Sequence, residues 1–399
     1  MRRQPLTALL LVLTLSACAG ASEAPYPAGK ASHVNGYLVL HLAGDGEQLG
    51  HQQARLAGRL VKRVVKEVLL EGEAAGAKYE PMMRGAAVME RYLPEEWRAE
   101  LKALARDTGL RYLDLVALQL FGDIQRGQRC TTYAALGPAT RSGECIVGRN
   151  MDFWDHGVSR YAGCILHYTP STGLPFMTVS WCGIINGWTA MNSAGIVCAN
   201  NTAYGGKDTI EGLSTCFMIR KVAQYARTVE EGVRIVQETP RACGTNLLIA
   251  GGNPPAAAIV EFDHDKVAVR WAHKGYVCAD NSFRLLGQVT TLAGFEGDAG
   301  SEAGPRTESQ DLLEDDSFGG YWLSRDQLLA KLIRTNFGLI DDSMNFAAAE
   351  GVPIRSINLQ SALLFPQRLT FRLSMGKVPA ADQAYRRFAM THQGIVSDN

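Results

Sequence analysis

The stretch CTTYAALGPATRSGECIVGRNMDF, residues 130–153, decides the fold of this chain. Residues 130–136 have the alternation of a strand, and a Gly- and Pro-containing turn at 137–143 leads into a returning strand at 145–150. Two such runs joined by a short polar turn are typical of an antiparallel hairpin. A change from helical to strand patterning therefore falls at Cys130.

Downstream of this hairpin the sequence predicts more strand pairs with two helices among them. Further strands are expected at 164–169, 176–181, 188–191, 196–200, 246–250, 257–262, 267–271, 276–279, 357–364 and 368–373. Thr228 and Glu231 form a capping box for a helix that Pro240 ends, and Ser324 and Gln327 form a second box. The acidic, Gly- and Ser-rich run at 294–320 is expected to be a surface loop.

Upstream, residues 47–120 have helical patterning. Leu49, Leu56, Leu60 and Val64 share one helical face. A second helix starts near Pro94 and stops at Gly109, and a third covers residues 112–121. Helices separated from long antiparallel meanders predict an α+β fold in which two sheets pack face to face with helices outside.

Bulk composition excludes some classes of partner. The 399 residues carry 40 Lys and Arg against 40 Asp and Glu, and 46% are hydrophobic. A balanced charge gives no electrostatic reason to expect nucleic acid as a partner. The hydrophobic share is large enough for a full core.

The first 18 residues have the pattern of a targeting segment. Met1-Arg-Arg3 is basic and residues 6–15 are apolar, a run too short to span a bilayer, which needs ~20 residues. The run ends in Leu15-Ser-Ala-Cys18, which resembles the lipobox of a bacterial lipoprotein. This resemblance implies lipidation of Cys18 and an exported, membrane-anchored protein, on the outer membrane facing the periplasm or on the cell surface. An ordinary signal peptide with a chance cysteine remains the alternative.

The cysteines suggest neither a disulfide framework nor a metal site. Setting Cys18 and Cys130 apart leaves seven of the nine, each placed singly, most of them in apolar runs, as small core residues would be. The sequence contains no CxxC and no HExxH motif, and its eight histidines are scattered. We therefore expect no metal and no organic cofactor. Trp181 and Trp188 are expected in the core rather than on a substrate wall.

Cys130 is the candidate nucleophile because it opens a strand directly after a helical, pro-like segment. A thiol needs a neighbouring base or a lowered pKa to become nucleophilic. Cleavage between Arg129 and Cys130 would supply such a base, since an α-amine has a reference pKa of ~7.7–8.0.

Several motifs in order resemble the N-terminal-nucleophile (Ntn) hydrolases, whose nucleophile is the first residue of a self-cleaved chain. They are CTT at 130–132, GRNMDF at 148–153, WTAMNSAGIV at 188–197, NN at 200–201, ADNSF at 279–283 and Ser324-Arg325. The resemblance is to the penicillin acyl-coenzyme-A:6-aminopenicillanic acid acyltransferase family, related to conjugated bile acid hydrolase and acid ceramidase. It extends from about residue 44 to 388 and implies a four-layer αββα sandwich.

The resemblance also implies roles for individual residues. Cys130 would be the nucleophile and its freed amine the base. Arg149 would hold the thiolate, and Asp152 would orient the amine. Asn201 (or its neighbour Asn200) and Asn281 would supply the oxyanion-hole donors. Arg325 would support Cys130 and Arg149 from the far side. Asp280 and Ser282 replace the family's Thr and His around Asn281, and Arg129 replaces a glycine before the cleavage point.

We therefore expect a signal peptide at 1–18, a helical pro-segment or α-chain at 19–129, and a catalytic β-chain at 130–399. Its substrate would be a small-molecule acyl-amide, and its lasting partner its own cleaved α-chain. Two alternatives stay open: a lipid-anchored binding protein that is not processed, and a cysteine peptidase assisted by His156 or His167.

Overall fold

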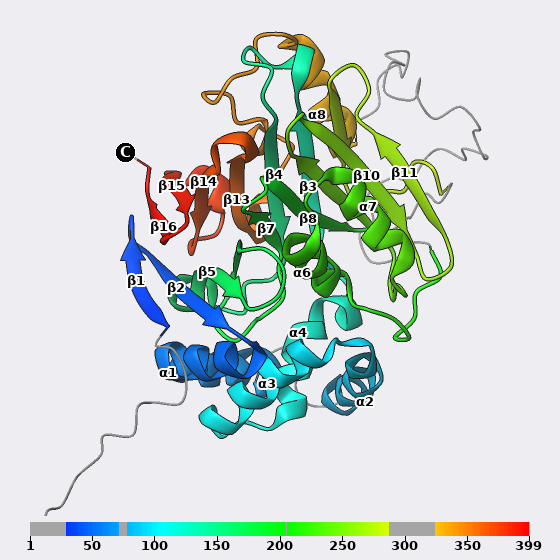
Figure 1. Cartoon of the computed structure of the whole chain (residues 1–399). Helices are drawn as coiled ribbons and strands as arrows, with labels where there is room; N and C mark the ends of the chain where they lie inside the picture. The colour runs from blue at the N-terminus through cyan, green and yellow to red at the C-terminus, as the bar shows by residue number, and fades with distance from the viewer. Residues whose placement is uncertain (1–28, 72–77, 205, 287–323, 399) are drawn as a thin grey trace, which may run out of the picture.

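The computed structural model describes residues 29–71, 78–204, 206–286 and 324–398 (Figure 1). Cys18 and the loop expected at 294–320 lie outside these residues. Within them, no helix is long and apolar enough to cross a bilayer.

Two sheets organise the described residues. The first has nine strands in the order β1 (Lys30–Val34), β2 (Tyr37–Gly44), β5 (Gly163–Pro170), β6 (Phe176–Trp181), β7 (Thr189–Asn192), β8 (Ile196–Thr202), β9 (Thr245–Gly251), β10 (Ala256–Phe262) and β11 (Val267–Trp271). The second has seven, in the order β12 (Tyr276–Ala279), β3 (Arg129–Ala135), β4 (Ile146–Asp152), β13 (Asn358–Phe365), β14 (Thr370–Met375), β15 (Arg386–Thr391) and β16 (Gly394–Ser397). Adjacent strands are antiparallel except β2 and β5, which are parallel.

Helices cover both outer faces and complete four layers (Figure 1). They are α1 (Gly46–Val65), α2 (Tyr79–Met89), α3 (Glu95–Thr108), α4 (Tyr112–Gln125), α5 (Ser159–Ala162), α6 (Thr215–Tyr225), α7 (Val229–Glu238) and α8 (Arg325–Thr335). A π-helical turn, Lys66–Leu70, follows α1. Side chains of both sheets, such as Val197 and Leu364, form one core between them. α8 packs on the seven-stranded sheet and most other helices on the nine-stranded one, which confirms the predicted αββα sandwich.

The hairpin that decided the fold forms as predicted. β3 and β4 pair with Cys130 opposite Met151 and Tyr133 opposite Gly148. The Tyr133 ring lies over Gly148, where an added Cβ would be 2.0 Å from a ring carbon, so only glycine fits. Thr228 accepts a hydrogen bond at the start of α7, and the Ser324–Gln327 capping box opens α8.

The leading segment differs from the expectation of a wholly helical companion. Residues 30–44 form the β1–β2 hairpin, and β2 joins β5 inside the nine-stranded sheet. The turn is Asn35-Gly36, both with positive φ, as a two-residue hairpin turn requires. β2 is a half-buried strand that was not predicted from the sequence. β15 and β16, the last two strands, were also not predicted.

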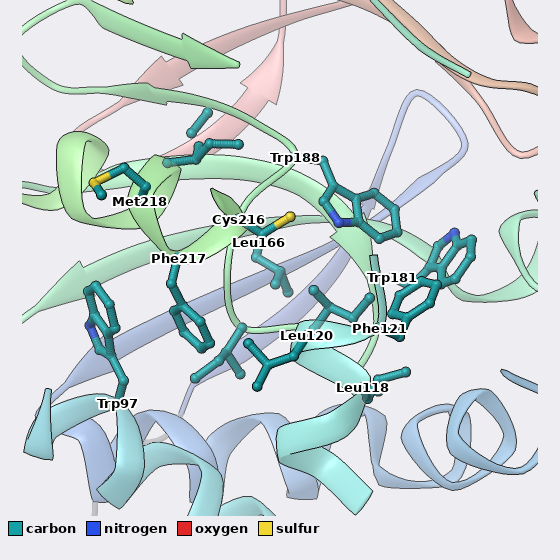
Figure 2. Close-up of a cluster of buried hydrophobic side chains, with 14 of the residues drawn as sticks. Trp97, Leu118, Leu120, Phe121, Leu166, Trp181, Trp188, Cys216, Phe217 and Met218 are labelled. Carbon is teal, nitrogen blue, oxygen red and sulfur yellow. The ribbon is translucent and has the colours of Figure 1, made fainter. Parts of the chain in front are cut away.

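Trp181 and Trp188 lie in the core, as expected. Their rings meet edge to face with centroids 4.9 Å apart, and Phe121 of α4 stacks on Trp181 (Figure 2). All eight cysteines of the described residues are buried and unbridged.

Candidate active site at the Arg129–Cys130 junction

The β3–β4 pairing places Cys130 and Arg149 on the side of the seven-stranded sheet that faces the other sheet. Directly opposite residues of an antiparallel pair share a face, and Cys130 lies opposite Met151 while Thr132 lies opposite Arg149. Asp152, one residue further along β4, therefore points to the other face, toward α8. Cys130 and Arg149 are fully buried.

Arg149 is held between the sheets by weak hydrogen bonds. Its guanidinium donates to the Thr189 hydroxyl at 3.4 Å, to the Asn201 side-chain oxygen at 3.4 Å and to the Trp188 carbonyl at 3.5 Å. The Asn201 amide donates in turn to the Thr132 hydroxyl at 2.7 Å. Asn201 thus connects β8 with the strand that carries Cys130.

Arg325, the first residue of α8, bridges three groups on the other face. One guanidinium nitrogen donates to the Asp152 carboxylate at 3.0 Å. Another donates to the Cys130 carbonyl at 3.2 Å and to the Asn281 side-chain oxygen at 2.6 Å. The helix start itself is fixed by an ion pair between Arg284 and Asp326. Because Arg325 directly follows the N-cap Ser324, the capping box that fixes the start of α8 also fixes the position of Arg325.

Asp152 is fully buried but well supplied with donors. Besides Arg325, the Ile354 backbone N–H donates to it at 3.0 Å and the Asn358 amide at 2.7 Å. Burial raises the pKa of Asp152 above its ordinary value, and the Arg325 charge acts in the opposite direction. No hydrogen bond joins Asp152 directly to Cys130 among the described residues, so its link to Cys130 runs through Arg325.

Asn281 spans the bond expected to be cleaved. Its side-chain oxygen accepts the Cys130 backbone N–H at 2.9 Å, and its amide donates to the Gln128 carbonyl at 3.1 Å and to the Thr202 carbonyl. Asn246 donates to the carbonyls on either side of Asn281, at Asp280 (3.0 Å) and Ser282 (2.8 Å). The backbone around Asn281 is therefore fixed although Asp280 and Ser282 depart from the family pattern.

Asn200 and Asn201 serve different neighbours. Asn201 contacts Thr132 and Arg149, as described above. The Asn200 amide donates instead to the Gln128 side-chain oxygen at 3.4 Å. The six residues singled out from the sequence therefore fall into two groups. Cys130, Asp152, Asn281 and Arg325 share hydrogen bonds at the Arg129–Cys130 junction. Arg149 and Asn201 bond to each other on the opposite face of the sheet, and Asn201 reaches the strand of Cys130 through Thr132.

A second set of residues, not predicted from the sequence, holds the chain before Cys130. The Tyr204 hydroxyl donates to the Gln128 carbonyl at 3.3 Å, and the Thr202 hydroxyl donates to the Gln128 side chain at 2.7 Å. The guanidinium carbons of Arg126 and Arg129 lie 5.0 and 5.3 Å from the centroid of the Tyr204 ring. These contacts join residues distant in sequence, which local motifs do not reveal.

The two candidate histidine bases lie in other surroundings. The His156 ring contacts the rings of Phe121, Phe153 and Trp181 at 6.1–6.4 Å. His167 faces His41 in a cavity whose lining does not include Cys130. Among the described residues, no group of three or more His, Cys, Asp or Glu side chains is placed to hold a metal ion.

Two kinds of sequence comparison give matches. The model of the family described as acyl-coenzyme A:6-aminopenicillanic acid acyl-transferase matches residues 139–316, a range that includes Arg149, Asn201 and Asn281 but not Cys130 or Arg325. An uncharacterized protein of Archaeoglobus fulgidus is 26% identical over 276 residues, 61% of this chain and 46% of that protein. Protein dcd1B of Dictyostelium discoideum is 24% identical over 261 residues, 59% and 52% of the two chains. This chain spans about half the length of these relatives.

Solved structures also resemble the chain, at low scores. A Caenorhabditis elegans ortholog of N-acylethanolamine-hydrolyzing acid amidase matches with a TM-score of 0.41 and 13% identity, over 63% of this chain and 96% of its own. A mutant conjugated bile acid hydrolase from Clostridium perfringens matches with a TM-score of 0.44 and 15% identity, over 67% and 96%. Residues 139–316 of this chain are thus similar to the acyl-coenzyme A:6-aminopenicillanic acid acyl-transferase family, and the match covers less than half of the chain.

Proposed function

We propose that the protein is a self-cleaving cysteine Ntn enzyme that hydrolyses or transfers the acyl group of small-molecule amides. The observation that carries this proposal is the hydrogen bonding of the Cys130 main chain. Asn281 accepts its N–H, which belongs to the bond that would be cut, and Arg325 donates to its carbonyl, in the next peptide group along the chain. The amine released by cleavage would already lie beside a hydrogen-bond acceptor.

Self-cleavage would proceed by an N-to-S acyl shift. The Cys130 sulfur attacks the Arg129 carbonyl carbon, the peptide C–N bond breaks, and the nitrogen takes a proton to become the α-amine. Water then hydrolyses the thioester, which releases the Arg129 carboxylate and restores the thiol. The complete burial of Cys130 in the uncut chain supports the order of events, because a substrate could reach the thiol only after the preceding segment has moved.

The released amine would act as the base for substrate turnover. It takes the thiol proton while sulfur attacks the substrate carbonyl carbon, and it returns the proton to the leaving amine. Donors aimed at the carbonyl oxygen stabilise the charge that develops in the transition state. Asn281 and Asn201 are the proposed donors, and water or a second amine accepts the acyl group. Penicillins, N-acyl amino acids, conjugated bile acids and N-acyl lactones form the substrate panel.

The division into two chains is part of the proposal. Residues 19–129 would be the α-chain and residues 130–399 the β-chain. Apolar side chains of α1, α3 and α4 share one buried core with β5 to β8, which supports an α-chain that stays bound after cleavage.

The decisive experiment compares wild type with Cys130→Ala by mass spectrometry and denaturing electrophoresis. We expect two co-purifying chains from wild type, with the second beginning at Cys130, and one chain from the variant. Cys145→Ala is the matched control, because Cys145 is another buried thiol, at the far end of the β3–β4 hairpin, and should leave cleavage intact. An intact wild-type chain without amidase activity would favour the binding-protein alternative. An intact wild-type chain that hydrolyses the panel would instead favour the histidine-assisted peptidase.

We also propose export and anchoring through a lipid on Cys18, with the protein at the outer membrane facing the periplasm or at the cell surface. Wild type should sediment with membranes and Cys18→Ser should move to the soluble fraction, since each buried CH₂ of a lipid chain contributes ~0.8 kcal/mol. Equal partitioning of the two proteins would contradict the anchor and leave the catalytic proposal untouched.

A further inference from the structure

A cavity of about 610 Å³ lies at the end of the sandwich where the first and last strands meet. Figure 1 shows β1 beside β16 there, at the edges of the two sheets. Strands β1, β2, β5 and β16 and the turn before β16 line it. A volume in this range is typical of small-molecule sites. Nothing in the proposed amidase chemistry uses this cavity.

Two imidazoles form its inner wall. His41 on β2 and His167 on β5 are register partners on adjacent parallel strands, and their ring centroids are 5.6 Å apart. Their neighbours on the same face, Val39 and Ile165, are apolar core residues of the inter-sheet layer. The two histidines therefore stand where the strand pattern calls for apolar side chains.

The imidazoles have little hydrogen bonding from the protein. His167 is 4% exposed, and no hydrogen bond from any described residue reaches its ring. His41 contacts the Ser32 hydroxyl at 3.2 Å, but its Nδ1 atom is buried without a partner. A buried polar ring without a partner is costly, so His167 is the ring that a ligand in the cavity would satisfy.

The remaining lining shows what that ligand would carry. Among the described residues it has no Asp or Glu, while Lys30 offers positive charge and the side chains of Thr169, Gln393 and His392 offer hydrogen-bond donors. Val34, Leu42 and Ile395 add an apolar wall. A cation would meet Lys30 with no acidic group to balance it, whereas an anion with a hydrocarbon part matches both walls.

We infer that this cavity binds a small organic carboxylate, with its charged end at His41 and His167 and its apolar part against Val34, Leu42 and Ile395. The ionisable groups that line the cavity are Lys30 of β1, His41 of β2, His167 of β5 and His392 of the turn before β16. A bound carboxylate stabilises protonated imidazole. By linkage, binding is tighter at lower pH.

The test uses purified protein labelled with ¹³C in its histidine rings, titrated with sodium hexanoate and, separately, with 1-hexanol. We expect hexanoate to raise the pKa of His167 from about 4 to about 6.5, which makes its binding about tenfold tighter at pH 5.5 than at pH 7.5. Hexanol, which has no charge, should leave both histidines unshifted. An equal response to hexanol, or no response to hexanoate, would overturn the inference.

Variants locate the effect. His167→Gln should abolish the tenfold pH dependence, and Lys30→Gln, at the exposed rim where folding is not at risk, should weaken hexanoate binding several-fold. His273→Gln removes an exposed histidine outside the cavity and should change nothing. Zn²⁺ alone is the last arm: a shift of His41 and His167 by the metal, without one by hexanoate, would replace the carboxylate site by a metal site and contradict the proposal.

Discussion

Arg325 and Asp152 form an ion pair of 3.0 Å although 173 residues separate them in the chain. The pair ties the first turn of α8 to the last residue of β4, on the face of the seven-stranded sheet that is turned away from the other sheet. Since the same guanidinium also donates to Cys130 and Asn281, the position of one helix end determines the geometry on both sides of Cys130.

The bridging geometry predicts that Arg325 cannot be replaced by lysine. A lysine ammonium keeps the charge near Asp152 but cannot donate in the fixed fork that also reaches Cys130 and Asn281. We expect Arg325→Lys to slow self-cleavage and turnover at least tenfold, with a stability loss of about 1 kcal/mol. Gel time courses, steady-state kinetics and urea unfolding measure the three quantities. Arg334→Lys, at the far end of α8, is the control, and a wild-type rate in Arg325→Lys would refute the bridging role.

The separate contacts of Asn200 and Asn201 predict separate phenotypes. Asn201 lies with Arg149 and Thr132, so as a transition-state donor its replacement by alanine should cut kcat by ~10²–10³. Within the described residues Asn200 donates to Gln128 alone, so Asn200→Ala should slow self-cleavage roughly 2- to 10-fold, the effect of one neutral hydrogen bond. Kinetics on the processed proteins separate the two. The reverse pattern would assign the oxyanion role to Asn200.

Tyr204 is predicted to assist self-cleavage through its hydroxyl. Tyr204→Phe keeps the ring beside Arg126 and Arg129 and removes the hydroxyl, which bonds to the Gln128 carbonyl and to the Arg129 side chain. Loss of about 0.5–1.5 kcal/mol should slow cleavage roughly 2- to 10-fold in a cell-free translation time course. Tyr92→Phe, a change at an exposed ring, should cleave at the wild-type rate. Unchanged cleavage in Tyr204→Phe would show that the segment before Cys130 is held without the hydroxyl.

Histidine burial predicts a loss of stability in mild acid. Burial lowers the pKa of His167 to about 4 from 6.5. The full stability is therefore present above pH 6.5, where the ring is neutral in both states. As the pH falls from 6.5 toward 4, the unfolded ring takes up a proton that the folded ring refuses. The loss approaches about 3 kcal/mol below pH 4.

Urea unfolding of the uncut Cys130→Ala chain at pH 7.5, 6 and 5 measures this loss, in buffers free of carboxylates. The His167→Gln variant should show a flatter dependence on pH, whatever its stability at pH 7.5. Burial also lowers the pKa of His41, so part of the slope should remain in the variant. Parallel slopes in the two proteins would mean that His167 titrates normally in the folded state.

The sequence predicted strands best where alternation and a turn occur together. One example is the hairpin of β5 and β6, Gly163–Pro170 and Phe176–Trp181. The start of α8 at Ser324 was predicted for the same reason, since its capping box also rests on contacts a few residues apart. The hairpin turn at Asn35-Gly36 has a sequence typical of such turns. It was not predicted because the segment leads into a long helical run and was assigned to the helical companion. β15 and β16 were missed because Arg386–Thr391 begins with exposed charges and Gly394–Ser397 is short.

The sequence predicted which residues make up the candidate site but not which of them contact one another. Motif order brought Cys130, Asn281 and Arg325 into one hypothesis, and the fold places them within hydrogen-bonding distance of one another. The partners of Gln128 could not be predicted from the sequence, because Tyr204 and Asn281 contact it only through the packing of separate strands. The link from Asp152 to Cys130 through Arg325 likewise required the position of α8.

The pairing of β2 with β5 has a consequence for how the protein would assemble. A cut after Arg129 would leave one continuous sheet built from strands of two polypeptides, with β1 and β2 on the shorter one. The uncut chain folds as a single molecule, whereas the cut protein, once denatured, must regain its sheet by a bimolecular encounter. Its refolding yield would then depend on protein concentration, and its persistence would rest on slow dissociation rather than on ready refolding.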